Sequence, residues 1–253
     1  MGHVGANEQN PARTGATVDE PRMAEMFDAV APVYDRLNTV MTFGIDGRWR
    51  RRALTETRLR AGDAALDACC GTGKLAALLA DRVGPFGRVE GVDLSPVMID
   101  RATETYHSLV QVNFQVGNAL TLPFADDEFD AATIGFGLRN LSDFAAGFRE
   151  LARVVRPGGR LVCLELSVPQ SRLWGKVYHS TFRHTAPLAA RLLGGPGEAY
   201  DYLPGSLEGF PDPDALAGHM RDAGLVDVHF FRMGTGVVCL HRGTVPNRPD
   251  ENA

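Results

Sequence analysis

Two glycines in the first third of the chain follow an apolar run in a pattern typical of nucleotide-like cofactor sites. Gly71 and Gly73 stand between a predicted buried strand and a predicted helix. At such a turn the backbone N–H groups face a ligand, and glycine lets the ligand approach closely. Asp93 ends the next apolar run about 20 residues further on, a spacing at which a carboxylate meets ribose hydroxyls. The motifs predict a ribose-containing cofactor; the structural alternatives are a tight turn and a helix-capping aspartate.

Asp67, which precedes the glycine turn, separates two classes of cofactor. A dinucleotide fingerprint needs a third glycine or alanine, and Ala76 occupies that position. A carboxylate at position 67 would repel a pyrophosphate, whereas it would hydrogen-bond a cationic amino-acid end. S-adenosylmethionine has this end and no phosphate. The loop therefore favours S-adenosylmethionine over a nicotinamide dinucleotide.

A further polar side chain follows the third predicted strand. Asn118 and Ala119 come directly after Gly117. An Asn side chain offers both a donor and an acceptor, which suits an adenine edge. Because Asn is also common in turns, a purely structural role is the alternative.

Short apolar runs alternate with helical patterns around these residues. The runs predict strands at residues 64–69, 88–92, 113–116, 131–136 and 160–166. The patterns between them predict helices at residues 74–82, 96–108 and 143–155. This alternation predicts an α/β fold with a mostly parallel sheet, whose ligands lie at the carboxyl ends of the strands. A C-terminal antiparallel hairpin at residues 226–231 and 236–241 closes the predicted sheet.

The flanking segments define the domain organisation. Helices are expected before the first strand, with a break at Pro32, and a helical insertion is expected at residues 170–224. Residues 1–20 and 244–253 have no hydrophobic period and are expected to be flexible tails. Since the chain has no repeat and no linker, we expect one domain at residues 21–243.

Composition and charge exclude several classes of function. The chain carries 26 Lys and Arg against 31 Asp and Glu, a net charge of −5, which disfavours a nucleic-acid partner. Its four cysteines include an adjacent pair and lack metal-ligand spacing, so no metal site is expected. Neither an apolar leader nor a run of about 18 apolar residues is present. These features predict a cytoplasmic protein whose contact with lipid, if any, is peripheral.

Several longer stretches resemble known proteins. LDACCGTG, GVDLSPVMIDRA, GNALTLPFADDEFDAATI and LARVVRPGGRLVCLE resemble class I S-adenosylmethionine-dependent methyltransferases. FDAVAPVYDRLNTVMTFGIDGRWRR, FGLRNLSDF, YDYLPGSLEGFPD and GTGVVCLHRG are similar to the ubiquinone/menaquinone biosynthesis C-methyltransferases. The resemblance implies a Rossmann-like, seven-stranded methyltransferase sheet. It also implies methyl transfer from S-adenosylmethionine to a ring carbon of a prenylated quinol, as from demethylmenaquinol to menaquinol.

The resemblance also implies roles for single residues in the cofactor site. The residues that would contact the cofactor by motif position are Thr72, Asp93, Asn118 and Ala119. Gly135 stands where some relatives have a cofactor-contacting serine. Lys74 departs from the family, which commonly has Asp after Gly-Thr-Gly.

Three residues are implied on the acceptor side. Arg139, Asn140 and Tyr34 would hold the quinol oxygens and a water. Because an arginine stays protonated, its role would be to stabilise a developing phenolate. The structural alternative is that Arg139 and Asn140 cap the helix that begins near Asp143.

A prenylated quinol is a lipophilic small molecule, which the chain would have to shelter. Residues 23–45 and the stripe of Trp174, Val177, Tyr178 and Phe182 are expected to wall an apolar tunnel, or else to pack as core. Arg172, Lys176 and Arg183 are expected to touch anionic lipid. The sequence does not decide between a monomer and a homodimer. The alternatives are a C-methyltransferase acting on a phenolic, polyketide or isoprenoid intermediate of specialised metabolism, and a non-catalytic binding protein.

Overall fold

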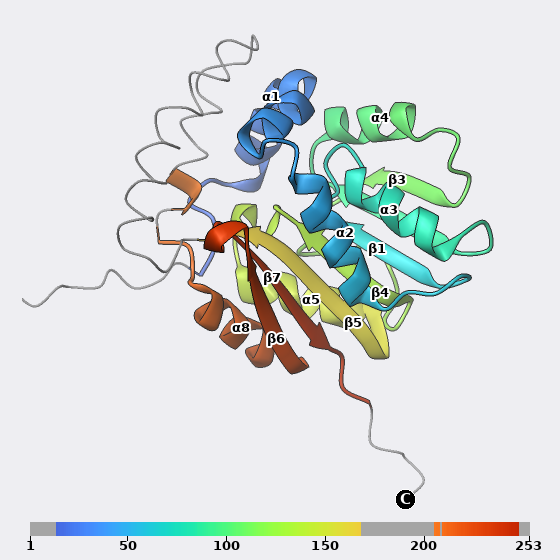
Figure 1. Ribbon diagram of the computed structural model, residues 1–253, viewed down its shortest axis with the longest axis vertical. Helices are drawn as coiled ribbons and strands as arrows, with labels where there is room; N and C mark the ends of the chain where they lie inside the picture. The colour runs from blue at the N-terminus through green and yellow to red at the C-terminus, as the bar shows by residue number, and fades with distance from the viewer. Residues whose placement is uncertain (1–13, 168–204, 208, 248–253) are drawn as a thin grey trace, which may run out of the picture.

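A computed structural model describes residues 14–167, 205–207 and 209–247 of the chain (Figure 1). The predicted aromatic stripe at residues 174–182 and the basic residues Arg172, Lys176 and Arg183 lie outside this described part, as does most of the expected helical insertion. The end of that insertion is described and forms the helix α8 (Pro213–Asp222).

Seven strands form one twisted sheet in the order β3-β2-β1-β4-β5-β7-β6. The strands are β1 (Ala64–Ala68), β2 (Arg88–Asp93), β3 (Val112–Val116), β4 (Phe129–Gly135), β5 (Val155–Leu166), β6 (Val226–Met233) and β7 (Val238–Thr244). The first five pair in parallel, and β7 runs antiparallel to both β5 and β6. The predicted class, a mostly parallel sheet that an antiparallel hairpin completes, is confirmed.

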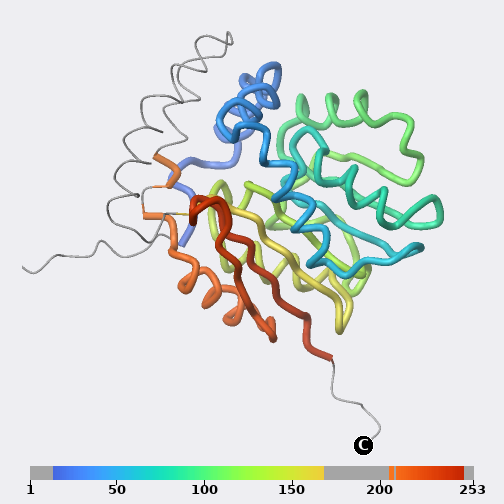
Figure 2. The backbone as a smooth tube through the Cα atoms, viewed as in Figure 1, coloured from blue at the N-terminus to red at the C-terminus, as the bar shows by residue number. Residues whose placement is uncertain are grey.

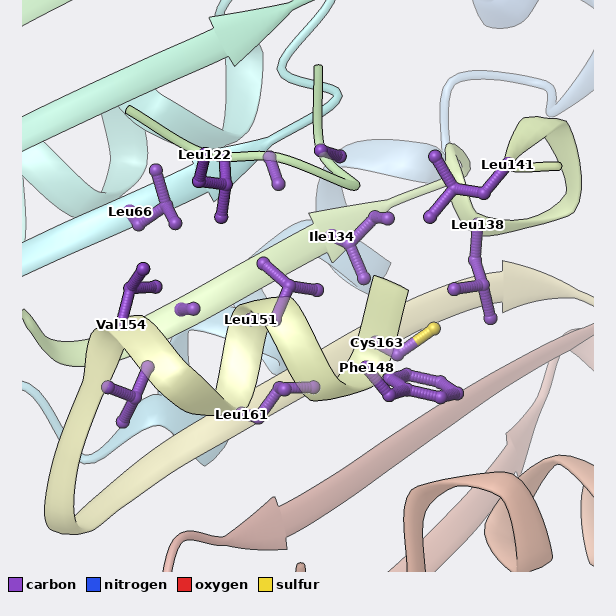
Figure 3. Close-up of a cluster of buried hydrophobic side chains, with 14 of the residues drawn as sticks. Leu66, Leu122, Ile134, Leu138, Leu141, Phe148, Leu151, Val154, Leu161 and Cys163 are labelled. Atoms are coloured by element: carbon purple, nitrogen blue, oxygen red, sulfur yellow. The ribbon is translucent and has the colours of Figure 1, made fainter. Parts of the chain in front are cut away.

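Helices cover both faces of this sheet. α2 (Asp46–Thr57) and α3 (Lys74–Val83) pack on one face, and α5 (Phe144–Val154) and α8 pack on the other. Consecutive residues of β1 serve the two sides: Ala65 belongs to the cluster under α3, and Leu66 belongs to the cluster under α5 (Figure 3). Because both faces are covered, a central strand is apolar almost throughout, which is why its pattern was readable.

α1 (Glu20–Met41) stands at the carboxyl end of the parallel strands, packed against α4 (Pro96–Thr105) (Figure 1). Asp19 caps its first turn by accepting the N–H of Arg22 at 3.1 Å. The expected break at Pro32 is wrong, since α1 continues to Met41. A proline inside a helix costs roughly 3 kcal/mol. Val30 and Ala31, beside the proline, are buried against Met98 of α4, and this apolar contact offsets the cost.

The ends of the domain extend beyond the predicted boundaries. The carbonyl of Thr14 accepts the N–H of Phe144 at 2.8 Å, and Ala16 donates to the carbonyl of Leu141. These residues therefore lie against the domain and do not belong to a flexible tail. At the other end, the N–H of Val245, just after β7, donates to the carbonyl of Gly159 at 3.0 Å. The described chain ends on the side of the sheet away from α1 (Figure 2). No helix within the described ranges is long and apolar enough to cross a membrane.

Candidate active site

The glycine turn links β1 to α3 at the carboxyl edge of the sheet. Cys69, Gly71 and Gly73 all have positive φ angles, of 52°, 55° and 82°. At Gly73 a Cβ atom would also lie only 2.8 Å from the ring of Phe114. Both the backbone conformation and the lack of space therefore require glycine at position 73, which begins α3 with its N–H groups facing the edge.

Asp93 ends β2 and joins two loops of the site. Its carboxylate accepts the N–H of Gly71 at 2.8 Å and the N–H of Ser95 at 3.0 Å. Burial raises the pKa of Asp93. Ser95, and not Asp93, caps α4 through the N–H of Met98. The carboxylate therefore fixes the glycine turn, and because each oxygen has a second lone pair it retains acceptor capacity for ribose hydroxyls.

Asp67 is 1% exposed and only partly satisfied. Its Oδ1 atom accepts the hydroxyl of Thr133 at 2.7 Å, while Oδ2 has no hydrogen-bond partner among the described residues. Burial raises the pKa of Asp67 to about 7. An isolated buried carboxylate is costly, and an added cation at Oδ2 would remove that cost. The cationic amino-acid end of S-adenosylmethionine is such a group, so the residues present fit this cofactor.

Five of the residues predicted from the sequence surround one small cavity. Tyr34, Asp67, Gly71, Thr72 and Gly135 line a space of about 20 Å³. That volume holds about one water molecule, whereas pockets for cofactor-sized ligands measure roughly 300 Å³ or more. The residues are gathered in the right place, and Tyr34 of α1 narrows the space beside them.

Carboxylates of α1 hold the polar groups that the cofactor was predicted to contact. Asp35 accepts the hydroxyl of Thr72 at 2.9 Å and pairs with Lys74 Nζ at 3.0 Å. Glu20 accepts the side-chain N–H of Asn118 at 2.7 Å. Lys74, the departure from the family pattern, is therefore paired with α1.

Asn118 and Ala119 are placed by the loop after β3. The Oδ1 atom of Asn118 accepts the N–H of Leu120 at 2.9 Å, as in the predicted turn role. Ala119 is buried in the hydrophobic cluster of Leu66 and Leu122. Its backbone, and not its methyl group, is what a cofactor at this edge could meet.

Arg139 lies in a short 3₁₀ helix (Leu138–Asn140) after β4 and is 5% exposed. Its guanidinium donates to Glu165 Oε1 and to the carbonyl of Phe136, each at 2.6 Å. The backbone N–H of Arg139 donates to Glu165 Oε2 at 3.2 Å. Asn140 ends the same turn, and its N–H donates to Gly137. The alternative capping role falls to Asp143, which itself accepts the N–H of Ala146 at 2.8 Å.

Tyr34 connects α1 with this acceptor side. Burial raises the pKa of its hydroxyl, while the positive charges of Arg139 and Arg50 act in the opposite direction. A hydrogen bond with the side chain of Asn38 also favours the ionised form. A phenol that feels the charges of two guanidinium groups suits a region where negative charge develops on an acceptor.

Sequence reasoning missed two residues of this site, Arg50 and Glu165. Arg50 lines the cavity, pairs with Asp46 and lies 5.3 Å over the ring of Phe136. Glu165, which is 0% exposed, stands in the apolar run of β5. A charged residue inside such a run was a signal that it needs a buried partner.

The fold is shared with solved methyltransferases. A S-adenosylmethionine-dependent methyltransferase from Thermotoga maritima superposes with a TM-score of 0.63 at 19% identity, covering 88% of this chain and 99% of the other. Another from Aquifex aeolicus gives a TM-score of 0.58 at 20% identity and covers 78% of this chain and 89% of the other. The fold, the glycine turn and the acid after β2 define a class I S-adenosylmethionine-dependent methyltransferase.

Similarity of sequence is more specific. A model of the ubiE/COQ5 methyltransferase family matches residues 16–245. A demethylmenaquinone methyltransferase from Halalkalibacterium halodurans is 37% identical over 235 residues, 92% of this chain and 96% of the relative. Another from a Geobacillus strain is 38% identical over 226 residues, which cover 88% of this chain and 97% of the relative. The chain belongs to the ubiE/COQ5 methyltransferase family.

Proposed function

We propose that this enzyme methylates a ring carbon of a prenylated quinol and converts demethylmenaquinol to menaquinol. The observation that carries the proposal is the similarity, along most of both chains, to relatives named demethylmenaquinone methyltransferases. The site agrees with this chemistry. The glycine turn predicted to bind the cofactor follows β1, and the buried Arg139 follows β4, the strand that pairs with β1.

The cofactor side would be formed by the residues around the glycine turn. S-adenosylmethionine supplies a methyl group on a positively charged sulfur, which is already a good leaving group. Asp67 would hold the cationic amino-acid end and Asp93 the ribose hydroxyls. The remaining contacts are assigned to Gly71, Thr72, Gly73, Asn118, Ala119 and Gly135. The chain's main task here is alignment, which lowers the barrier of a displacement between two bound groups.

The acceptor side has to raise the electron density of the quinol ring. A ring carbon becomes nucleophilic when a neighbouring hydroxyl loses its proton. Arg139 would stabilise the resulting phenolate, and Asn140 and Tyr34 would hold the quinol oxygens and a water that receives the proton. Glu165 fixes the guanidinium of Arg139, so the positive charge is in place before the acceptor arrives.

The remaining partners follow from the chemistry of the acceptor. A prenyl tail needs an apolar tunnel, and α1 would form part of its wall. We place the enzyme in the cytoplasm, in peripheral contact with the membrane that holds its acceptor. The homodimer left open by the sequence stays a prediction.

The direct test incubates the purified chain with methyl-labelled S-adenosylmethionine and demethylmenaquinol. Mass spectrometry should find the label on the ring carbon, with one S-adenosylhomocysteine formed per methyl transferred. A panel of phenols without prenyl tails, assayed in parallel, should react much more slowly. Faster methylation of a phenol would favour the specialised-metabolism alternative, and cofactor binding without S-adenosylhomocysteine would favour a binding protein.

A further inference from the structure

Exposed apolar side chains gather at residues 40–45, which comprise the end of α1 and the turn that joins it to α2. Phe43 is 92% exposed, Val40 is 52% exposed and Ile45 is 37% exposed. Exposed large apolar side chains that gather on one short segment are unusual in a soluble surface and often mark a contact with a partner. Elsewhere in the described surface such residues are spread over separate loops and strands.

The turn is held in one conformation by its own hydrogen bonds. The N–H of Gly44 donates to the carbonyl of Thr39 at 2.8 Å, and the N–H of Ile45 donates to Thr42 at 3.0 Å. Phe43 has a φ of 50°, a region that costs a non-glycine residue about 1 kcal/mol or more. The backbone therefore bears strain in a conformation that presents the Phe43 ring to the outside.

Positive charge surrounds the turn, although the chain as a whole is acidic. Between residues 35 and 52 the sequence has five arginines and two aspartates, against a net charge of −5 for the entire chain. Both aspartates are engaged, Asp35 with Lys74 and Asp46 with Arg50. Arg36, Arg48 and Arg51 are exposed. Arg36 lies one helical turn before Val40 and Arg48 follows Ile45 by three residues, so cationic side chains flank the apolar ones on both sides.

We propose that the turn of residues 40–45 docks the enzyme on an anionic lipid bilayer. Phe43, Val40 and Ile45 enter the headgroup region, and the flanking arginines bind lipid phosphates. The inference rests on the proposed function, in which the acceptor is a lipid-soluble quinol. It adds a location: Tyr34 and Asp35 of the same helix lie at the cofactor edge, so docking through the end of α1 turns that edge toward the membrane. Phe43, which points outward, is not part of the tunnel wall.

The chain offers a matched control on its opposite edge. Phe86 is 93% exposed, as Phe43 is, but it precedes β2 and so lies at the amino ends of the parallel strands. Phe43→Ser and Phe86→Ser remove the same ring from equally exposed positions. Phe86 also stands between two arginines, but Arg88 is paired with Glu128 and Arg82 follows Asp81, so the positive charge there is offset. Only Phe43 combines exposed apolar neighbours with the arginines of residues 36–52, so the two variants separate a specific docking surface from non-specific hydrophobic binding.

The experiment is co-sedimentation of the full chain with vesicles of phosphatidylcholine, alone or mixed with phosphatidylglycerol. The wild type and Phe86→Ser should bind the mixed vesicles, and Phe43→Ser should bind them about tenfold more weakly, as expected for one lost buried ring. Replacement of Arg36, Arg48 and Arg51 by Gln should abolish the preference for anionic lipid. Thermal melting checks that each variant is folded.

Three outcomes would overturn the proposal: wild-type protein that binds neither vesicle, a Phe43→Ser variant that binds as wild type does, or an equal loss in Phe86→Ser. Methylation of a short-tailed, water-soluble quinol is measured on the same preparations. Phe43→Ser should keep this activity while it loses activity on a long-tailed quinol in vesicles. If no quinol is methylated by the wild type, the proposed function fails, whereas vesicle binding reports on the docking surface independently.

Discussion

Two carboxylates are buried at the same edge of the sheet, and their surroundings differ. Glu165 on β5 is bonded by the guanidinium and the backbone N–H of Arg139 and by the N–H of Leu166. Asp67 on β1 has one hydroxyl partner and one oxygen without a partner in the described chain. Among the described residues, the first has a guanidinium directly paired with it, whereas the second feels only the charge of Arg50 across the cavity and has no cation bonded to it. This contrast indicates that Glu165 positions a residue of the enzyme, whereas Asp67 is prepared for a cation that comes with a ligand.

The largest effect should come from breaking the Glu165 pair. Glu165→Leu leaves the Arg139 charge buried without its partner and should lower the free energy of unfolding by about 3–5 kcal/mol. Replacing both residues, Arg139→Met with Glu165→Leu, should recover more than half of this loss, because no charge is left buried. Urea unfolding of the three proteins measures the difference. A double variant as unstable as the single one would mean that packing, and not charge, sets the cost.

The second effect concerns turnover. Arg139→Lys keeps a positive charge near Glu165 but loses the planar fork that fixes its direction. We expect kcat to fall by about 100-fold, since misplaced charge stabilises the developing phenolate poorly. Cofactor affinity, measured by calorimetry, should change by less than about threefold, because Arg139 is assigned to the acceptor.

A matched control for this variant lies on α5. Arg153→Lys alters an arginine that pairs with Glu150 and Asp126 on the far side of the sheet. It should leave kcat unchanged. Equal losses in the two variants, or lost cofactor binding in Arg139→Lys, would contradict the assignment.

The contrast between these carboxylates also shows what the sequence could predict. The fold was predictable because short apolar runs alternate with amphipathic helices, and the glycine turn followed from its position after β1. The partner of Arg139 could not be predicted, because residues 139 and 165 come together only when β4 and β5 pair. The continuation of α1 through Pro32 depends in the same way on contacts with α4, which local propensity does not contain. Asn118 was assigned to adenine from its chemistry alone, and its amide group is held by Glu20, 98 residues away in the chain.

The third effect concerns the pH dependence of cofactor binding. Because burial raises the pKa of Asp67 from 3.8 to about 7, the folded protein holds a proton there that the unfolded chain has lost. Stability of the ligand-free protein should therefore fall as pH rises from about 4 to 7. A cationic ligand binds the ionised carboxylate, so affinity for S-adenosylmethionine should rise with pH up to about 7 and then level off. Binding should release close to one proton well below pH 7 and about half a proton at pH 7. Calorimetry in buffers of different ionisation enthalpy counts this proton.

Asp67→Asn provides the comparison for this proton. It keeps the shape of the side chain and removes both the charge and the titration. Cofactor affinity should fall by about 10- to 100-fold, the range for a lost charge-assisted hydrogen bond, and the released proton should disappear. In the Asp67→Asn variant, the stability of the ligand-free protein should also no longer fall as the pH rises toward 7. An affinity that is independent of pH in the wild type would show that Asp67 does not meet a cation.

The smallest effect should come from the helix that covers Asp67. Asp35 holds Thr72 and Lys74 from α1, and these contacts must open before a cofactor enters the small cavity behind them. Because the pair of Asp35 with Lys74 is partly exposed, Asp35→Ala should change stability by less than about 1 kcal/mol. The loss should nevertheless favour the open arrangement and speed cofactor association a few-fold in stopped-flow measurements. Glu25→Ala removes an exposed carboxylate from the same helix without touching the site and should leave the rate unchanged. Slower association in Asp35→Ala would mean that Asp35 itself helps to bind the cofactor, which would place a third functional carboxylate beside Asp67 and Asp93.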